Sequence, residues 1–118
     1  MMLTETSYAK DLNYQQFVKE VISDYRLALL SRQLSLTGRK EVLTGKAKFG
    51  IFGDGKEIVQ IAYAKQFKVG DWRSGYYRDQ TFMMASGLLT AEEFFSQLYG
   101  TADDQVCPGN AGLLPVAA

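Results

Sequence analysis

Residues Gly70 to Gln80 contain the side chains of this sequence that are best suited to chemistry. The segment Gly70-Asp-Trp-Arg-Ser-Gly-Tyr-Tyr-Arg-Asp-Gln80 holds two Asp, two Arg, three large aromatic residues and two Gly. Arginine offers a planar fork of donors to phosphate or carboxylate, and tyrosine adds a hydroxyl and a flat apolar face. This composition indicates a site that holds an anion beside a flat ring. The alternative is a surface turn in which Asp79 forms a solvated ion pair with Arg73 or Arg78.

A second stretch, Gly53-Asp54-Gly55, has the form of a turn that can present its aspartate to Mg²⁺. A diphosphate-bridging site of this form needs an Asn roughly 25–30 residues downstream as a second oxygen ligand, and residues 80 to 90 contain none. A phosphate-binding P-loop is also excluded, because Glu57 stands where the motif after Lys56 needs Ser or Thr. We therefore interpret the stretch as a glycine-rich entry to a helix.

Composition excludes several classes of function. The 118 residues suffice for about one small domain. The 13 basic residues balance the 13 acidic ones, which argues against nucleic-acid binding and against an electrostatic membrane anchor. No apolar run approaches the roughly 20 residues of a membrane span, and the N-terminus has no secretory signal. The single cysteine, Cys107, can form no internal disulfide, so we expect a cytoplasmic protein.

The chain contains no histidine. It therefore lacks the usual general base, the usual partner of a catalytic nucleophile and the commonest metal ligand. We expect no catalytic residue and no metal ligand within the chain. A cation or a base would have to come from a cofactor or from another segment.

The elements that position these residues are predicted to be mainly helices. Residues 14 to about 34 form an amphipathic helix with Asn13 as its N-cap and Gly38 as its stop. We expect its apolar stripe to pack in the core; the alternative is a partner-binding face, since the stripe widens at residues 27 to 30. The stripe comprises Phe17, Val18, Val21, Ile22, Tyr25, Ala28 and Leu29.

The rest of the chain divides into shorter segments. Thr90 and Glu93 have the spacing of a capping box, and Gly100 follows that helix at its C-terminal end. In order, we predict a lead-in over residues 1–13, a helical region over 14–100 and an irregular tail over 101–118. Within the helical region lie a glycine-punctuated loop (38–56), helices at about 56–67, 80–86 and 90–100, and a strand or extended loop at 72–77.

Several segments, taken in order, resemble the α-type subunit of 2-oxo acid dehydrogenases over roughly residues 14 to 112. The closest resemblance is to the branched-chain (2-oxoisovalerate) type, in particular the bacterial form with fused α and β parts. The segments are Asp24-Tyr-Arg-Leu-Ala-Leu-Leu-Ser-Arg32, Gly45 to Phe52, Asp54-Gly-Lys-Glu-Ile58, Gly70-Asp-Trp72, Gly75-Tyr-Tyr-Arg-Asp79 and Phe94-Phe-Ser-Gln-Leu-Tyr-Gly100.

The resemblance implies the N-terminal helical region of an α/β thiamine-diphosphate-binding fold, in an oxidoreductase that decarboxylates a 2-oxo acid and passes the acyl group to lipoyl-lysine. It implies that Tyr77 and Arg78 bind the diphosphate of the cofactor. It also places Phe49, Ile51 and Phe52 at the substrate pocket. Pyruvate-type enzymes carry a His at the position of Ile51 and another at that of Gln80, so an apolar Ile51 favours a branched aliphatic acid.

The resemblance ends near Gly112, and the last six residues depart from the family pattern. The family continues into a His-bearing loop, a Mg²⁺-binding motif and a cofactor domain, and its catalytic Glu belongs to the β-type part. We therefore expect a truncated fragment that is inactive alone. Its partners would be a β-type dehydrogenase part, fused or separate, and a lipoyl-bearing acyltransferase core. The alternative hypothesis is a small helical protein-interaction module without catalysis.

Overall fold

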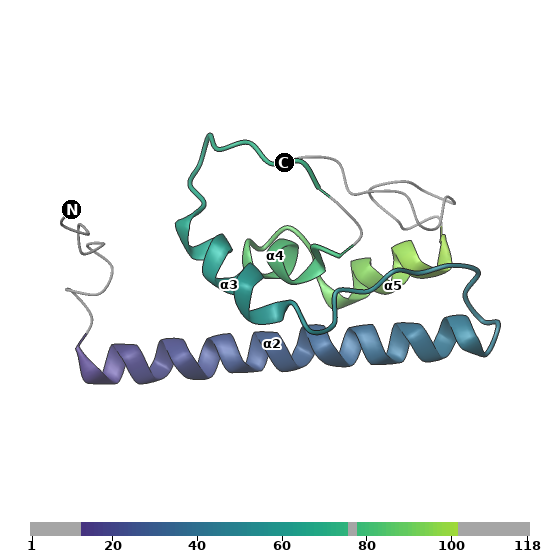
Figure 1. Ribbon diagram of the computed structural model, residues 1–118, viewed down its shortest axis with the longest axis horizontal. Coiled ribbons are helices and arrows are strands. Elements are labelled where there is room, and N and C mark those ends of the chain that lie inside the picture. Colours follow the sequence, from purple (N-terminus) through teal and green to yellow (C-terminus); the bar gives the residue numbers. More distant parts are fainter. Residues whose placement is uncertain (1–12, 76–77, 102–118) are drawn as a thin grey trace.

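The computed structural model describes residues 13–75 and 78–101, which form four α-helices and no strand. The long helix α2 (Tyr14–Leu43) carries the three shorter helices α3 (Glu57–Gln66), α4 (Gln80–Ala85) and α5 (Ala91–Tyr99) on one of its sides (Figure 1). The prediction of a mainly helical region is confirmed. No helix in the described part is long and apolar enough to cross a membrane. The described residues do not include Tyr76, Tyr77 or Cys107. Of the predicted lead-in and tail, they include only Asn13 and Thr101.

Helix α2 begins as predicted but ends later. Asn13 caps it through a capping box, in which the Asn13 side chain accepts from the backbone of Gln16 and the Gln16 side chain accepts from that of Asn13. The prediction that Gly38 stops the helix was wrong, because Gly38 is buried within it. A Cβ atom on Gly38 would lie 2.5 Å from the ring of Phe52, so this glycine makes room for a packed aromatic side chain. The helix ends at Leu43, followed by Gly45 with φ 78°.

The predicted core stripe of α2 is largely exposed, which corrects our expectation. The buried positions are Ser31, Leu34, Ser35 and Gly38, whereas the predicted core residues Phe17, Val21, Ile22, Tyr25 and Leu29 remain exposed. The reason is geometric, because a 30-residue helix is about 45 Å long and the shorter helices cover only one side of it. Periodicity identified the helix, but it did not identify which face packs.

The shorter helices lie close to their predicted positions. Thr90 and Glu93 form the predicted capping box at the start of α5, and Gly100 ends that helix in a left-handed conformation with φ 64°. The described part of the segment between α3 and α4, residues 72–75, contains no strand, so the extended-loop alternative holds there. The loop predicted over 38–56 is shorter, since residues 38–43 belong to α2.

The core lies where α2, α4 and α5 meet. The ring centroid of Phe94 lies 6.1 Å from that of Phe52 and 5.3 Å from that of Phe95. Phe82 of α4 packs edge-on against Phe67, with ring centroids 5.2 Å apart. The core residues are Leu34, Ala47, Phe82, Met83, Leu89, Phe94 and Leu98.

Candidate functional site

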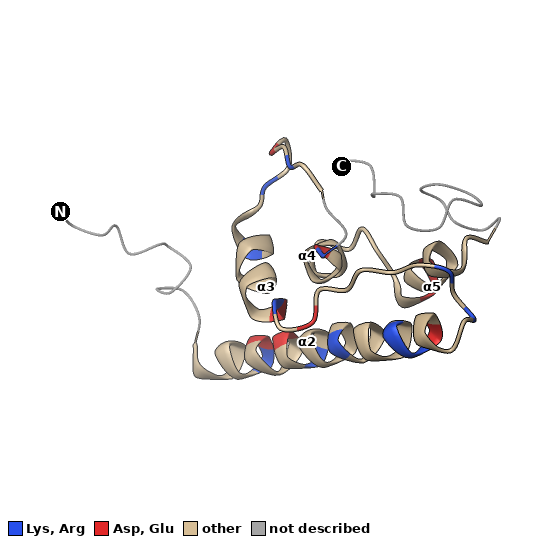
Figure 2. Cartoon of the chain, turned by 45° about the vertical axis from the view of Figure 1, so that its right-hand side comes forward, with Lys and Arg blue, Asp and Glu red and all other residues tan. Residues whose placement is uncertain are grey.

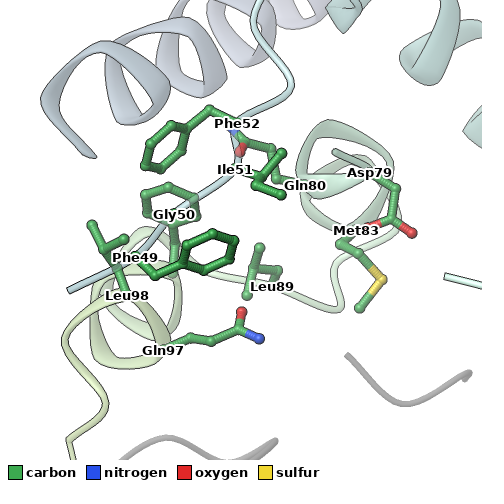
Figure 3. Close-up of a pocket in the computed structure, with 11 residues that line it drawn as sticks. Phe49, Gly50, Ile51, Phe52, Asp79, Gln80, Met83, Leu89, Gln97 and Leu98 are labelled. Carbon is green, nitrogen blue, oxygen red and sulfur yellow. The ribbon is translucent and has the colours of Figure 1, made fainter. Parts of the chain in front are cut away.

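The three residues predicted to form a substrate pocket lie together. Phe49, Ile51 and Phe52, in the loop between α2 and α3, line a pocket of about 50 Å³ with residues of α4 and α5 (Figure 3). Asp79 and Gln80 line the same pocket from the start of α4. The structure thus brings the predicted pocket residues against the end of the segment Gly70 to Gln80.

Two glycines shape this pocket by giving space to Phe52. A Cβ on Gly50 would lie 2.5 Å from Cζ of Phe52, just as one on Gly38 would clash with the same ring. The Phe52 ring is therefore held between α2, the loop and Leu98 of α5. Gly38, which was predicted to stop a helix, and Gly50 of the glycine-punctuated loop both accommodate an internal aromatic ring.

Gln80, which stands at the position of a histidine in pyruvate-type enzymes, is a buried polar residue. Its amide nitrogen donates to the carbonyl of Ser31 at 3.1 Å and to the hydroxyl of Ser35 at 2.7 Å. Ser31 also bonds Thr81, with 2.6 Å between the hydroxyl oxygens. The amide oxygen of Gln80 has no hydrogen-bond partner in the described structure. The residues that line the pocket therefore include one buried hydrogen-bond acceptor that has no partner among the described residues.

Arg78 lines a second, larger recess on the other side of the α4 start. This groove has a volume of about 470 Å³ and runs between α3 and residues 72–79. Its walls carry the exposed aromatic side chains of Trp72 and Tyr63. The Arg78 side chain is exposed, and within the described residues no side-chain hydrogen bond or ion pair engages it. The groove therefore offers a cation beside flat aromatic faces; Tyr77, its predicted companion, lies outside the described residues.

The backbone of Arg78 is held by residues that sequence reasoning missed. Gln60 of α3 donates its amide to the Arg78 carbonyl at 2.7 Å and accepts from the backbone of Phe82 at 3.0 Å. Gly53 approaches the same carbonyl so closely that a Cβ there would lie 2.5 Å from its oxygen. The apolar pattern of the predicted helix at about 56–67 places Gln60 on its exposed side. The contact of Gln60 with the Arg78 backbone could therefore be recognised only from the tertiary structure.

The ion pair considered in the alternative interpretation forms, but most of its surface is removed from solvent. Arg73 pairs with Asp79, and only 6% of the Arg73 side chain is exposed. The guanidinium also lies over the Phe82 ring at 5.0 Å from its centroid. The Asp79 carboxylate lies between the pocket and the groove, and its negative charge is balanced by Arg73. The positive charge of Arg78 is therefore not balanced by Asp79. The two arginines of the segment thus have different roles.

The acidic residues near Gly53-Asp54-Gly55 also pair with arginines. Arg39 donates to Asp54 at 2.6 Å, and this hydrogen bond holds the Asp54 pKa below its ordinary value. Arg32 binds both carboxylate oxygens of Glu57, at 2.7 and 3.1 Å, and lowers the Glu57 pKa to about 2. The described residues contain no group of three or more potential metal ligands. Asp54 therefore anchors the loop to α2 in this structure.

Comparison with known proteins gives one match. A family model described as "Dehydrogenase E1 component" matches residues 25–112, a range that includes most of α2, all of α3, α4 and α5, the Phe49–Phe52 loop and Arg78. Searches of the curated proteins and of the solved structures found no match.

Proposed function

This chain belongs to the dehydrogenase E1 component family, and we propose on that premise that it is the N-terminal helical part of an enzyme that decarboxylates a branched-chain 2-oxo acid. Members of this family are thiamine-diphosphate-dependent E1 components of 2-oxo acid dehydrogenase complexes and work with other subunits. The proposal assigns the groove of Arg78 to the cofactor and the pocket of Phe49, Ile51 and Phe52 to the substrate.

The exposed guanidinium of Arg78 is the observation that carries the cofactor assignment. It lies in an open groove, while Gln60 and Gly53 fix its backbone. An arginine fork of this kind suits a diphosphate, so the residues present fit the anionic end of the cofactor. We assign Tyr77 to the same grip by family resemblance. When bound, thiamine diphosphate supplies the electron sink for decarboxylation; Mg²⁺ would accompany it on ligands from outside this chain.

The pocket assignment is supported by the size of the pocket and by its lining, which is mostly apolar and has Asp79, Gln80 and Gln97 as its polar members. Phe49, Ile51 and Phe52 present hydrocarbon to a space of about 50 Å³, a few times the roughly 10–15 Å³ that a cavity needs to hold one water. A space of this size suits the short aliphatic end of a branched acid, and Ile51 offers no hydrogen bond to a more polar substrate. Asp79 lines both the pocket and the groove, so the two assigned ligands would lie on either side of it.

The remaining chemistry is assigned to partners. We propose that a β-type part supplies the catalytic carboxylate and that a lipoyl-bearing acyltransferase accepts the acyl group. The chain has no histidine, so its role is to bind and orient rather than to move protons. We expect no decarboxylase activity from the 118 residues alone.

Calorimetry with thiamine diphosphate and Mg²⁺ tests the grip. We expect the isolated chain to bind with a Kd of about 1 mM or weaker, equivalent to about 4 kcal/mol or less, because it holds only one end of the cofactor. Arg78→Ala should abolish that binding, whereas Arg26→Ala, a matched exposed arginine on α2, should leave it unchanged. Equal losses in both variants would mean non-specific attraction and would overturn the assignment of Arg78, and micromolar affinity would contradict an incomplete site.

A further inference from the structure

Helix α2 has an apolar row on the side that faces away from the other described helices. Ile22, Leu29, Leu36 and Leu43 recur every seventh residue, and each is between 44% and 80% exposed. Seven residues make almost two helical turns, so these side chains form a line about 32 Å long at 1.5 Å per residue. The buried positions, such as Leu34 and Gly38, lie on the opposite face. Figure 1 shows α3, α4 and α5 all on that buried side.

A row of basic residues runs beside this apolar row. Lys19, Arg26 and Lys40 follow the same seven-residue spacing, with Gln33 between them, and all are exposed. We call the apolar row and this basic row together the outer face of α2. Because each basic residue stands four positions after or three before a member of the apolar row, the two rows lie side by side along the helix.

The acidic residues of α2 point elsewhere. Glu20 and Asp24 bind Lys65 of α3, and Glu41 accepts a hydrogen bond from Tyr99 of α5. They therefore lie on the sides of α2 that face the other helices. Figure 2 shows the acidic positions of α2 in red, below α3 and near the right-hand end of the helix. The charge of the outer face is basic and is not neutralised by acidic residues of the same helix.

We propose that the outer face of α2 binds an amphipathic helix of a partner protein that carries Leu or Ile at seven-residue spacing and Asp or Glu beside them. Apolar residues at this spacing are those that pack helix against helix, and the flanking charges select the partner. The row spans three full repeats, which is long enough for a continuous helix–helix contact. This inference does not depend on the cofactor or substrate assignments.

The charge pattern disfavours a second copy of this chain as the occupant. In an antiparallel pair of α2 helices about a twofold axis, the basic rows of the two copies would face each other, and like charges at these flanking positions oppose pairing. A membrane surface fits less well over the length of the helix. The first half of α2 exposes Phe17, Val21 and Tyr25, a broad apolar face such as membrane-bound helices carry, but beyond Tyr25 the exposed large apolar residues of α2 are only leucines, at positions 29, 30, 36 and 43. An acidic helix satisfies both the apolar and the basic rows.

Binding of a designed peptide tests the proposal. The probe is a fluorescent peptide of about four heptads with Leu at both core positions and Glu at the flanking positions; the matched peptide has Lys in place of Glu. Fluorescence anisotropy on the full 118-residue chain should show the Glu peptide binding at least tenfold more tightly than the Lys peptide. Leu29→Glu should weaken that binding at least tenfold, and Val69→Glu, at an exposed position outside α2, should not change it.

A charge-reversed variant of the chain gives a second test, which does not depend on whether Leu29→Glu folds correctly. The triple variant Lys19→Glu, Arg26→Glu, Lys40→Glu changes only exposed positions and should reverse the preference in favour of the Lys peptide, with unchanged helical circular dichroism. Several results would overturn the proposal: no binding of either peptide, equal binding of both, a dimer in sedimentation that Leu29→Glu dissociates, or binding to phosphatidylserine vesicles that requires Leu29.

Discussion

Helices α5 and α3 both pack on α2, but the chemistry of the two contacts is opposite. On the α5 side, Phe94 and Leu98 pack with Leu34 and the Phe52 ring, and Glu41 of α2 takes part through a hydrogen bond from the Tyr99 hydroxyl rather than through an ion pair with α5. On the α3 side, ion pairs connect the helices: Arg32 with Glu57, and Lys65 with Glu20 and Asp24. Apolar contact responds little to pH or salt, whereas exposed and half-buried ion pairs respond to both.

This difference has a consequence for the proposed function. The groove of Arg78 is built on α3, whose Gln60 holds the Arg78 backbone, whereas the proposed substrate pocket is built largely on the α5 side. Conditions that weaken the ion pairs should therefore disturb the proposed cofactor groove before they disturb the pocket. Four changes, ordered by expected effect, test whether the two contacts differ in this way.

Removal of a core ring should have the largest effect. Phe94→Ala deletes a buried side chain that packs on Phe52 and Phe95, and such deletions cost about 3–5 kcal/mol. Urea unfolding followed by circular dichroism should show a large loss of stability, and a small domain has little in reserve. Leu43→Ala, at an exposed position, is the control and should change the unfolding free energy by less than about 0.5 kcal/mol. Similar losses in both variants would mean that α5 is not the centre of the core.

The buried hydrogen bonds of Gln80 should rank second. Gln80→Leu removes the donor that binds the Ser31 carbonyl and the Ser35 hydroxyl. The Ser31 carbonyl keeps its place in the hydrogen bonding of α2, but the buried Ser35 hydroxyl loses this donor, and such a loss costs about 1–3 kcal/mol. The exposed Gln66→Leu supplies the control in the same unfolding assay. A stabilised Gln80→Leu variant would show that the unpartnered amide oxygen of Gln80 costs more than its donor bonds contribute.

The helices could be predicted from sequence because their signals are local. The Asn13 cap and the Thr90 capping box each depend on residues within one turn, and both are present. The end of α2 was mispredicted because Gly38 is a stop signal by local rules, yet the Phe52 ring, 14 residues away in the sequence, uses the space it leaves. A tertiary contact outweighed a local preference there.

The site was only partly predictable for the same reason. Phe49, Ile51 and Phe52 are neighbours in sequence, so their common pocket could be expected once family resemblance assigned them to it. Gln60 and Gln80 could not be recognised, because each has its role through partners 18 or more residues away. Polar residues give no periodic signal that predicts such partners, whereas apolar periodicity predicts helices without settling which face is buried.

Acid should weaken the α3 contact selectively. The Arg32 hydrogen bonds lower the Glu57 pKa to about 2 in the folded chain, against about 4.3 in an unfolded one. The stabilisation is therefore complete above about pH 4.3 and is lost as the pH falls towards 2. Since Arg32 is 45% exposed, we expect a loss of about 1–2 kcal/mol rather than the full value.

Urea unfolding between pH 6 and pH 2.5 measures this effect. Glu57→Gln should start less stable at pH 6 and should lose less stability on acidification than the unmodified chain, because its Arg32 contact does not titrate. Phe94→Ala should retain the full acid dependence, since it leaves the ion pair intact. An acid dependence that is unchanged in Glu57→Gln would assign the effect to other carboxylates and would weaken the contrast between the two contacts.

The Lys65 contacts should show the smallest effect and the clearest dependence on salt. Lys65 is half-buried between Glu20 and Asp24; burial lowers its pKa, but the hydrogen bonds to Asp24 and Glu20 outweigh that and raise it. Lys65→Met keeps the apolar stem and removes the charge, so we expect a loss of up to about 1 kcal/mol at low salt. The difference from the unmodified chain should shrink in 1 M NaCl, where the screening length falls to about 3 Å.

Phe94→Ala is the control for this salt response. It should lower the free energy of unfolding by as much at high salt as at low salt, because it removes apolar packing. If the salt responses of the two variants were equal, the α3 contact would rest on apolar packing as the α5 contact does, and the cofactor groove would be no more sensitive to conditions than the pocket.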